Sequence, residues 1–172
     1  MQHISMYELT NTQFIKVLGN LTRFIEKGEA YAGSKKFDVE VLLNSRLAPD
    51  QFHFIRQVQS SCDTAKLGAS RLTGKQAPVH EDTEKTLSEI KFRIEDVIRF
   101  LRTFTEADYN EAASNKISLP RWEGKFLSGA EYAIHHMIPN FYFHITTAYD
   151  ILRHNGVDVG KRDYLGELPL RN

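Results

Sequence analysis

The sequence has almost no cysteine: Cys62 is the single cysteine in 172 residues. One cysteine excludes an internal disulfide framework and a cysteine-based zinc cluster. The formal charge has no excess of either sign, because 22 Lys and Arg balance 22 Asp and Glu. Proteins dedicated to nucleic-acid binding carry a strongly basic face, so we expect no nucleic-acid partner.

Long apolar runs are also missing. No stretch of about 18 apolar residues occurs, which predicts no transmembrane helix and no membrane partner. The first residues, from Met1 to Glu8, do not place a basic region before an apolar stretch, so we expect no signal peptide and a cytoplasmic protein. The composition, 41% hydrophobic and 26% charged, is typical of a globular chain, and the length fits one domain over residues 1–172.

What the sequence does have is helical periodicity. Apolar residues recur at spacings of three and four in four long segments, as on one face of a helix. The predicted helices run from a Ser5–Glu8 capping box to about Ala32, from Pro49 to Gly74, from Leu87 to Phe104, and from a Ser128–Glu131 capping box to Asn155. Four such helices predict an all-α fold, a four-helix bundle.

Three details of this prediction depend on single residues. The periodicity places Phe52 on the apolar face of the second helix and Ile134 on that of the last. Pro139 lies inside the last pattern, so either one helix kinks there or two helices meet.

The segments between the helices are predicted as follows. Residues 115–129 favour a small two-stranded hairpin over one end of the bundle, in which Trp122 caps that end or lines a pocket. Residues 73–82 form a polar linker, and we expect its cluster of His80, Glu81 and Asp82 to be solvated.

The residues with the most chemistry lie in the last helix. On an unbroken helix His136, Asn140 and His144 stack on one face at steps of four. His136 and His144 are about 12 Å apart along the axis, so they cannot both bind one ion. A metal there would need Asn140 with one of them and further ligands from the second helix, where the nearest donors are Asp50, His53 and Gln57. The other interpretation is that these side chains satisfy one another through hydrogen bonds.

Four stretches of the sequence form a recognisable pattern: Asn44–Asp50, Arg56–Gln59, Pro139–His144 and Ala148–Gly156. Together they resemble an uncharacterised branch, a domain of unknown function, of the DinB/YfiT-like superfamily, and the similarity covers nearly the whole chain. The resemblance implies a four-helix bundle of up-down-down-up topology. It also implies a divalent metal held by three histidines in the better-known members, some of which are thiol-dependent transferases or isomerases.

The resemblance assigns this ligand pattern residue by residue. His144 matches the second histidine of the last-helix pair, and Asn140 stands where the first would be. The ligand from the second helix falls near His53 or Gln57. The sequence therefore departs from the metal pattern at Asn140.

Two hypotheses of function follow. In the first, a polar pocket lies between the second and last helices. Its lining residues are His53, Gln57, Asn140 and His144, with His136 as a neighbour. This pocket holds nickel or zinc, or uses His144 to polarise a substrate or bind a thiolate. In the second, the protein is a non-catalytic bundle without metal, whose polar stripe is structural or binds a small ligand. In either case a homodimer is expected.

Overall fold

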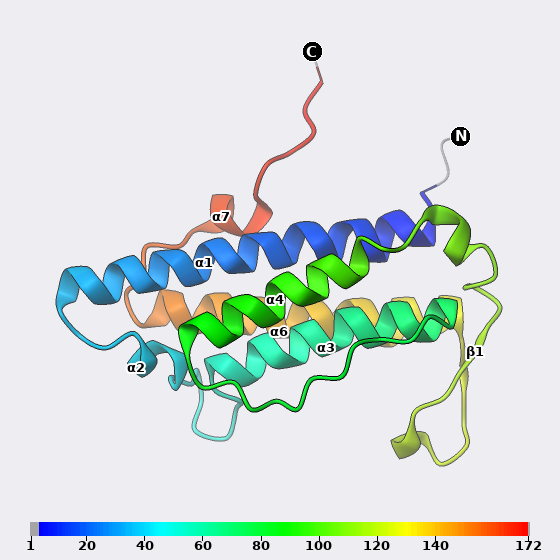
Figure 1. Cartoon of the computed structure of the whole chain (residues 1–172), viewed down its shortest axis with the longest axis horizontal. Coiled ribbons are helices and arrows are strands. Elements are labelled where there is room, and N and C mark those ends of the chain that lie inside the picture. Colours follow the sequence, from blue (N-terminus) through cyan, green and yellow to red (C-terminus); the bar gives the residue numbers. More distant parts are fainter. Residues whose placement is uncertain (1–3, 172) are drawn as a thin grey trace.

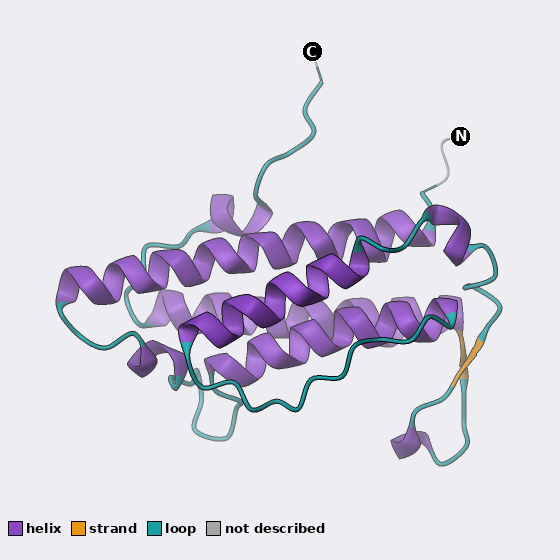
Figure 2. Cartoon of the chain, in the orientation of Figure 1, coloured by secondary structure: helices purple, strands orange, loops and turns teal. Residues whose placement is uncertain are grey.

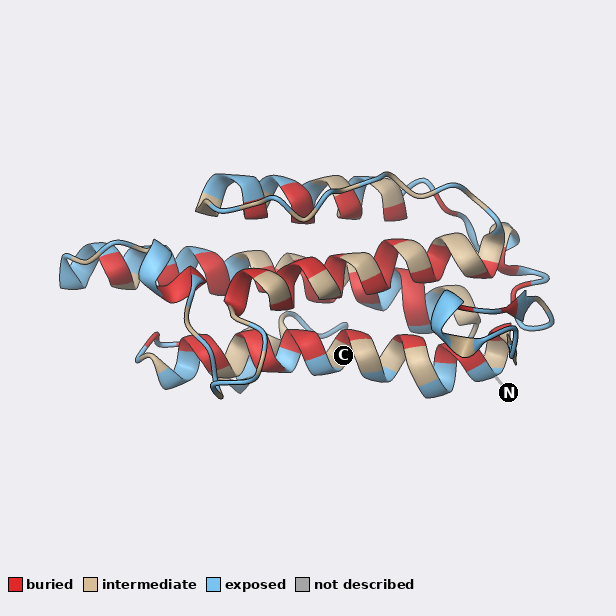
Figure 3. Cartoon of the chain, turned by 90° about the horizontal axis from the view of Figure 1, so that it is seen from below, coloured by how far each residue is buried: buried red, intermediate tan, exposed pale blue. Residues whose placement is uncertain are grey.

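Four long helices make up most of the computed structural model, which describes residues 4–171 (Figure 1). They are α1 (Gln13–Lys35), α3 (Phe54–Thr73), α4 (Leu87–Leu101) and α6 (Ile138–His154). Both α1 and α3 pack against α4 and α6, so the four helices enclose one core. Figure 3 shows the buried residues on the sides that face neighbouring helices. The chain is thus mostly helical, as predicted.

The remaining elements are short (Figure 2). Helix α2 (Glu40–Leu43) follows α1, and α7 (Lys161–Leu165) follows α6. Strands β1 (Lys116–Ile117) and β2 (Leu127–Ser128) form an antiparallel pair in which Lys116 faces Ser128 and Ile117 faces Leu127. This pair confirms the predicted hairpin. The single turns are the 3₁₀ helices Glu106–Tyr109 and Pro120–Trp122, the π-helices Glu8–Thr12 and Ala133–Met137, and α5 (Gly129–Tyr132).

Both predicted capping boxes are present. The Glu8 backbone N–H donates to Ser5 Oγ at 3.2 Å, and the Ser5 N–H donates to the Glu8 carboxylate at 3.1 Å. The same exchange joins Ser128 and Glu131 at 3.3 and 2.9 Å. Each box satisfies N–H groups that the start of a helix leaves without a partner.

The second long helix begins later than the sequence predicts. The expected start at Pro49 is wrong, because residues 49–52 form a turn and α3 begins at Phe54. His53 is the N-cap residue, and its Nδ1 accepts the backbone N–H of Arg56 at 3.3 Å. Phe52 therefore precedes the helix and is 49% exposed, not part of an apolar face. The first helix also runs on to Lys35, since Lys36, not Gly33, adopts the left-handed conformation that ends it.

The last helix passes through Pro139 without a break. Residues 129–154 are helical throughout, and the π turn Ala133–Met137 immediately precedes the proline. A π turn widens the helix just where proline removes a backbone donor and crowds the preceding turn. The Ile138 N–H donates to the Ala133 carbonyl, five residues back. Ala133 therefore takes the buried position expected for Ile134, which is 61% exposed, so the prediction for Ile134 is wrong.

Residues 74–86, called the strap below, return the chain along the outside of α3 to the start of α4 (Figure 1). The strap is not merely solvated, contrary to the prediction for its His80 cluster. Lys66 Nζ donates to His80 Nδ1 at 2.6 Å, and His80 Nε2 donates to Asp96 at 3.2 Å. Asp82 pairs with Arg93, which is 1% exposed, whereas Glu81 remains exposed as expected. Within residues 4–171, no helix is both long and apolar enough to cross a membrane.

Candidate functional site

A cavity of about 470 Å³ lies between α3 and the last helix, beside the loop of the hairpin. Three elements supply its walls, and the polar stripe that the sequence predicts forms one of them. The lining residues are Ser60, Asp63, Thr64, Leu67 and Arg71 of α3, Leu119, Pro120 and Arg121 of the hairpin loop, and Tyr132, His136, Asn140 and His144. The continuous helix through Pro139 thus brings His136, Asn140 and His144 to one cavity.

His144 is held by a chain of two hydrogen bonds behind the cavity wall. Gln57 Nε2 donates to the Phe52 backbone carbonyl at 3.0 Å, and Gln57 Oε1 lies 2.7 Å from His144 Nδ1. A carbonyl only accepts, so the first bond fixes which end of the amide faces His144. Nδ1 must therefore carry the hydrogen, and in the neutral ring Nε2 keeps its lone pair for a ligand.

The surroundings of His144 keep the ring neutral. Its side chain is buried, and burial lowers its pKa from the ordinary value because it disfavours the charged imidazolium. The positive charge of Arg56 lowers the pKa further. The geometry and the electrostatics agree: His144 offers an unprotonated nitrogen at neutral pH.

Asn140 is oriented in a similar way by α3. The Thr64 hydroxyl donates to the Ser60 carbonyl at 2.7 Å, so its oxygen accepts the Asn140 Nδ2–H, also at 2.7 Å. This bond uses one of the two Nδ2 hydrogens, so Asn140 can offer a ligand its amide oxygen and its second N–H.

His136 marks the other end of the cavity, where aromatic rings and two arginines meet. Its ring stacks on Tyr132 with centroids 5.4 Å apart, and Trp122 lies edge-on to it at 5.6 Å. Arg121 hydrogen-bonds His136 Nε2, and Arg71 donates to the Tyr132 hydroxyl at 3.1 Å. Burial and the two guanidinium charges lower the pKa of His136.

The two candidate ligands from the second helix have different places. His53 caps α3 and does not line the cavity, whereas Gln57 is fully buried directly behind His144. Of the two, only Gln57 contacts the stripe.

The donors present do not fit a divalent metal centre. In the part of the chain that the structure describes, no three His, Cys, Asp or Glu side chains lie close enough together to hold a metal ion. His144 is oriented as a metal-bound histidine would be, but Gln57 and Asn140 use amide groups to bind neighbouring protein atoms. Amides suit hard ions better than nickel or zinc. The metal set of His144, His53 and Asn140 stays a prediction that the geometry does not favour.

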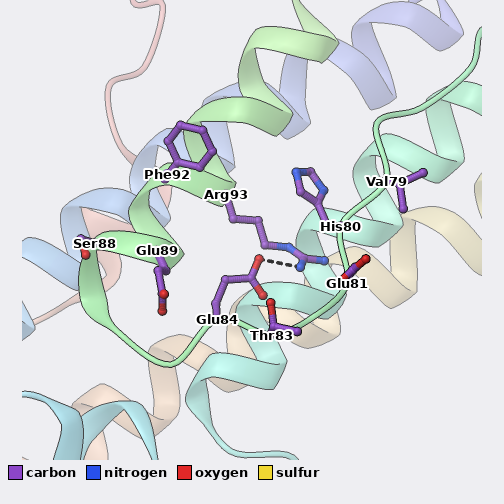
Figure 4. Close-up of a pocket in the computed structure, with 9 residues that line it drawn as sticks. All are labelled: Val79, His80, Glu81, Thr83, Glu84, Ser88, Glu89, Phe92 and Arg93. Atoms are coloured by element: carbon purple, nitrogen blue, oxygen red, sulfur yellow. Dashed lines mark hydrogen bonds and ion pairs between the residues drawn. The ribbon is translucent and has the colours of Figure 1, made fainter.

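A larger cavity, of about 610 Å³, lies between the strap and α4 (Figure 4). In Figure 4 the Arg93 guanidinium and the Glu84 carboxylate point toward one another, 2.8 Å apart. The Glu89 carboxylate accepts the backbone N–H groups of Lys85 and Thr86. Apart from the exposed Glu81, the charged groups of this cavity are thus committed to structural bonds, and none of the predicted site residues lines it. The smaller cavity is the better candidate.

Some residues of the smaller cavity were missed from the sequence. Ser60, Thr64, Leu67 and Arg71 follow one another at spacings of four, three and four, so they share a face of α3, and this periodicity could have identified them. Arg121 gave no such signal, because it lies in an irregular loop.

Comparisons with known proteins agree with this fold. The family model described as "Domain of unknown function (DUF1993)" matches residues 6–165. A crystal structure described as a DinB family member protein from Shewanella denitrificans is 58% identical in sequence, with a TM-score of 0.95. That match covers 97% of this chain and 95% of the other. A search of curated proteins found no match.

Proposed function

The chain belongs to the DUF1993 family of DinB-like domains of unknown function, and from that premise we propose that it binds a small organic molecule in the cavity between α3 and the last helix. In this proposal His144 Nε2 accepts a hydrogen bond from an acidic group of the ligand, such as a thiol. The role needs no metal ion. We choose a thiol as the acidic group because the sequence resembles a superfamily in which some members are thiol-dependent.

The observation that carries the proposal is the hydrogen-bonded chain from the Phe52 carbonyl through Gln57 to His144. A histidine whose only role is to fill space needs no fixed tautomer. Here a buried glutamine holds the ring of a histidine that lines the cavity, and Nε2 is the nitrogen left free. The lowered pKa of His144 favours acceptance of a hydrogen bond over full proton transfer, so the ring would polarise the bound group and not hold its proton.

The tautomer is the first test. We expect ¹⁵N spectra of histidine-labelled protein at pH 7.5 to show His144 neutral with the hydrogen on Nδ1, and Gln57→Leu to remove this preference. Titration with N-acetylcysteamine, an uncharged thiol, should then shift the His144 Nε2 signal. His144 in the opposite tautomer, or a signal that does not respond to the thiol, would contradict the proposal.

His144→Ala separates this proposal from the non-catalytic alternative. We expect the variant to stay folded and to lose its response to the thiol. Suppose instead that the free energy of unfolding falls by about 1–3 kcal/mol while thiol binding is unchanged. His144 would then be a structural group of a bundle without this function.

The metal version is tested separately with nickel and zinc. A specific ligand stabilises the folded state, so a true site should raise the melting temperature. We expect less than ~0.1 equivalent of either metal per chain after desalting and an unchanged melting temperature. One equivalent bound in the wild type but not in His144→Ala would restore the metal site of His144, His53 and Asn140.

Three further expectations belong to this proposal. The up-down-down-up assignment of the four-helix bundle is supported by the strap, which returns the chain so that α4 runs in the same direction as α3 (Figure 1). The homodimer is tested by light scattering of the full chain. A cytoplasmic location is tested by fractionation of the native cells.

A further inference from the structure

Two arginines lie at the His136 end of the cavity: Arg71, which is half-buried, and Arg121, which is exposed. Within residues 4–171, neither Arg71 nor Arg121 lies within ion-pair distance of a carboxylate; their partners are the Tyr132 hydroxyl and His136 Nε2. Other arginines of the chain do pair with acids, namely Arg56, Arg93, Arg99 and Arg153. Two positive charges therefore meet at one end of the cavity with only neutral acceptors.

The acid that lines the cavity does not offset these charges. Asp63 lies 2.7 Å from Arg93 Nη2 and 3.1 Å from Lys66 Nζ, so its negative charge is already shared by two buried cations. The end of the cavity formed by Arg71 and Arg121 thus carries net positive charge. A planar guanidinium with several donors suits a carboxylate or phosphate, which can accept two parallel hydrogen bonds.

His136 serves as a neutral acceptor beside the two arginines. Arg121 can only donate, so His136 Nε2 accepts its hydrogen bond and Nδ1 carries the hydrogen of the neutral ring. This Nδ1 atom is buried and has no hydrogen-bond partner in the part of the chain that the structure describes. A buried N–H without an acceptor is costly, but this atom has no exposed surface, so an anion in the cavity would contact the arginines and not Nδ1.

We infer that Arg71 and Arg121, beside His136, form an anion-binding subsite, and that the ligand of this cavity carries a carboxylate or phosphate group at the end away from His144. The inference rests on the proposed function, because it places the two ends of one ligand in one cavity. Two helical turns separate His136 from His144, so a ligand that reaches both ends is about 12 Å long. The rings of Tyr132 and Trp122 beside the subsite suit an apolar or aromatic portion next to the anion.

Three probes of similar shape test the subsite on the full chain: 3-phenylpropanoate, phenyl phosphate and the uncharged 3-phenylpropanamide. Each is titrated to about 20 mM and followed by ¹H–¹⁵N spectra, a range that detects millimolar dissociation constants. We expect at least one anion to bind and to shift the signals of His136 and Tyr132, and the amide to bind at least about tenfold more weakly. The better of the two anions identifies the natural group as a carboxylate or a phosphate.

Matched variants locate the binding. Arg71→Gln and Arg121→Gln should each weaken binding of the anion about tenfold, because each removes a charged donor. Arg102→Gln removes the same charge from an exposed position at the end of α4 and should leave binding unchanged. Melting temperatures confirm that the variants are folded.

The outcomes separate this inference from the proposed function. If neither anion binds, if the amide binds as tightly, or if both arginine variants bind like the wild type, the subsite is refuted, whatever the tautomer of His144. If His144→Asn keeps anion binding while His144 has the wrong tautomer, the proposed function fails and the anion subsite stands.

Discussion

Replacing Gln57 with leucine tests the hydrogen-bonded chain on which the candidate site depends. Gln57 is fully buried and makes two hydrogen bonds, one to the Phe52 carbonyl and one to His144 Nδ1. Phe52 is half exposed, so water can replace the first bond, but the His144 N–H would be left buried without an acceptor. Two lost bonds of about 1 kcal/mol each, with about 1 kcal/mol for the unpaired donor, predict a loss of about 3 kcal/mol in the free energy of unfolding.

A double-mutant cycle makes this prediction sharper. His144→Leu alone leaves the Gln57 oxygen unpaired, whereas Gln57→Leu with His144→Leu removes both polar groups. We therefore expect the double variant to be more stable than the sum of the single losses by about 1–2 kcal/mol.

Urea unfolding with linear extrapolation gives the four free energies, provided that the slope with denaturant stays constant. Gln13→Leu, at an exposed position in the first turn of α1, is the control and should change stability by less than about 0.5 kcal/mol. Losses that add to within about 0.5 kcal/mol would refute the coupling between Gln57 and His144.

Three other predictions concern the rest of the molecule. A Cβ at Gly129 would overlap the backbone carbonyl of Ala112, so Gly129→Ala should lower the melting temperature strongly. Gly19 has open space around it, so Gly19→Ala should not lower the melting temperature in this way. Equal effects of the two substitutions would contradict this packing. Arg93→Met leaves the partly buried Glu84 without a cation and leaves Asp63 and Asp82 with one partner each, so it should cost about 3 kcal/mol in urea unfolding. A neutral result would show that the strap does not depend on Arg93. Burial lowers the pKa of four histidines in the folded protein: His53, His80, His136 and His144. As the pH falls below 6.5, the unfolded chain therefore takes up protons before the folded one, and the free energy of unfolding should decrease, whereas the full stability is present above pH 6.5. A flat profile of the free energy of unfolding between pH 7 and 5 would contradict these lowered pKa values.

The periodicity of the sequence predicted the long helices and the wall of the candidate site that the last helix provides. The steps of four from His136 through Asn140 to His144 placed these side chains on one face, and capping chemistry located Ser5 and Ser128 at helix starts. These are local signals, since each depends on residues within two turns of a helix.

Periodicity and capping patterns did not predict features that depend on tertiary contacts, or cases in which two nearby residues could each start a helix. Pro49 has the features of a helix start, but His53 provides the cap, so the helix begins five residues later than the proline suggests. The phase of Ile134 was wrong because a π turn has no signature in apolar spacing. Arg121 reaches the cavity only because the hairpin folds over the end of the last helix, and the fixed tautomer of His144 depends on an amide orientation that spacing does not encode.

The Arg93 cluster also has a consequence for the rates of folding and unfolding. Its three acids come from α3 and from two positions in the strap, while Arg93 belongs to α4, so the cluster forms only after these segments have met. Interactions that form late are weak in the folding transition state, and their loss accelerates unfolding more than it slows folding. The ion pairs of the strap thus lengthen the lifetime of the folded protein. Stopped-flow measurements should show that Arg93→Met changes mainly the unfolding rate.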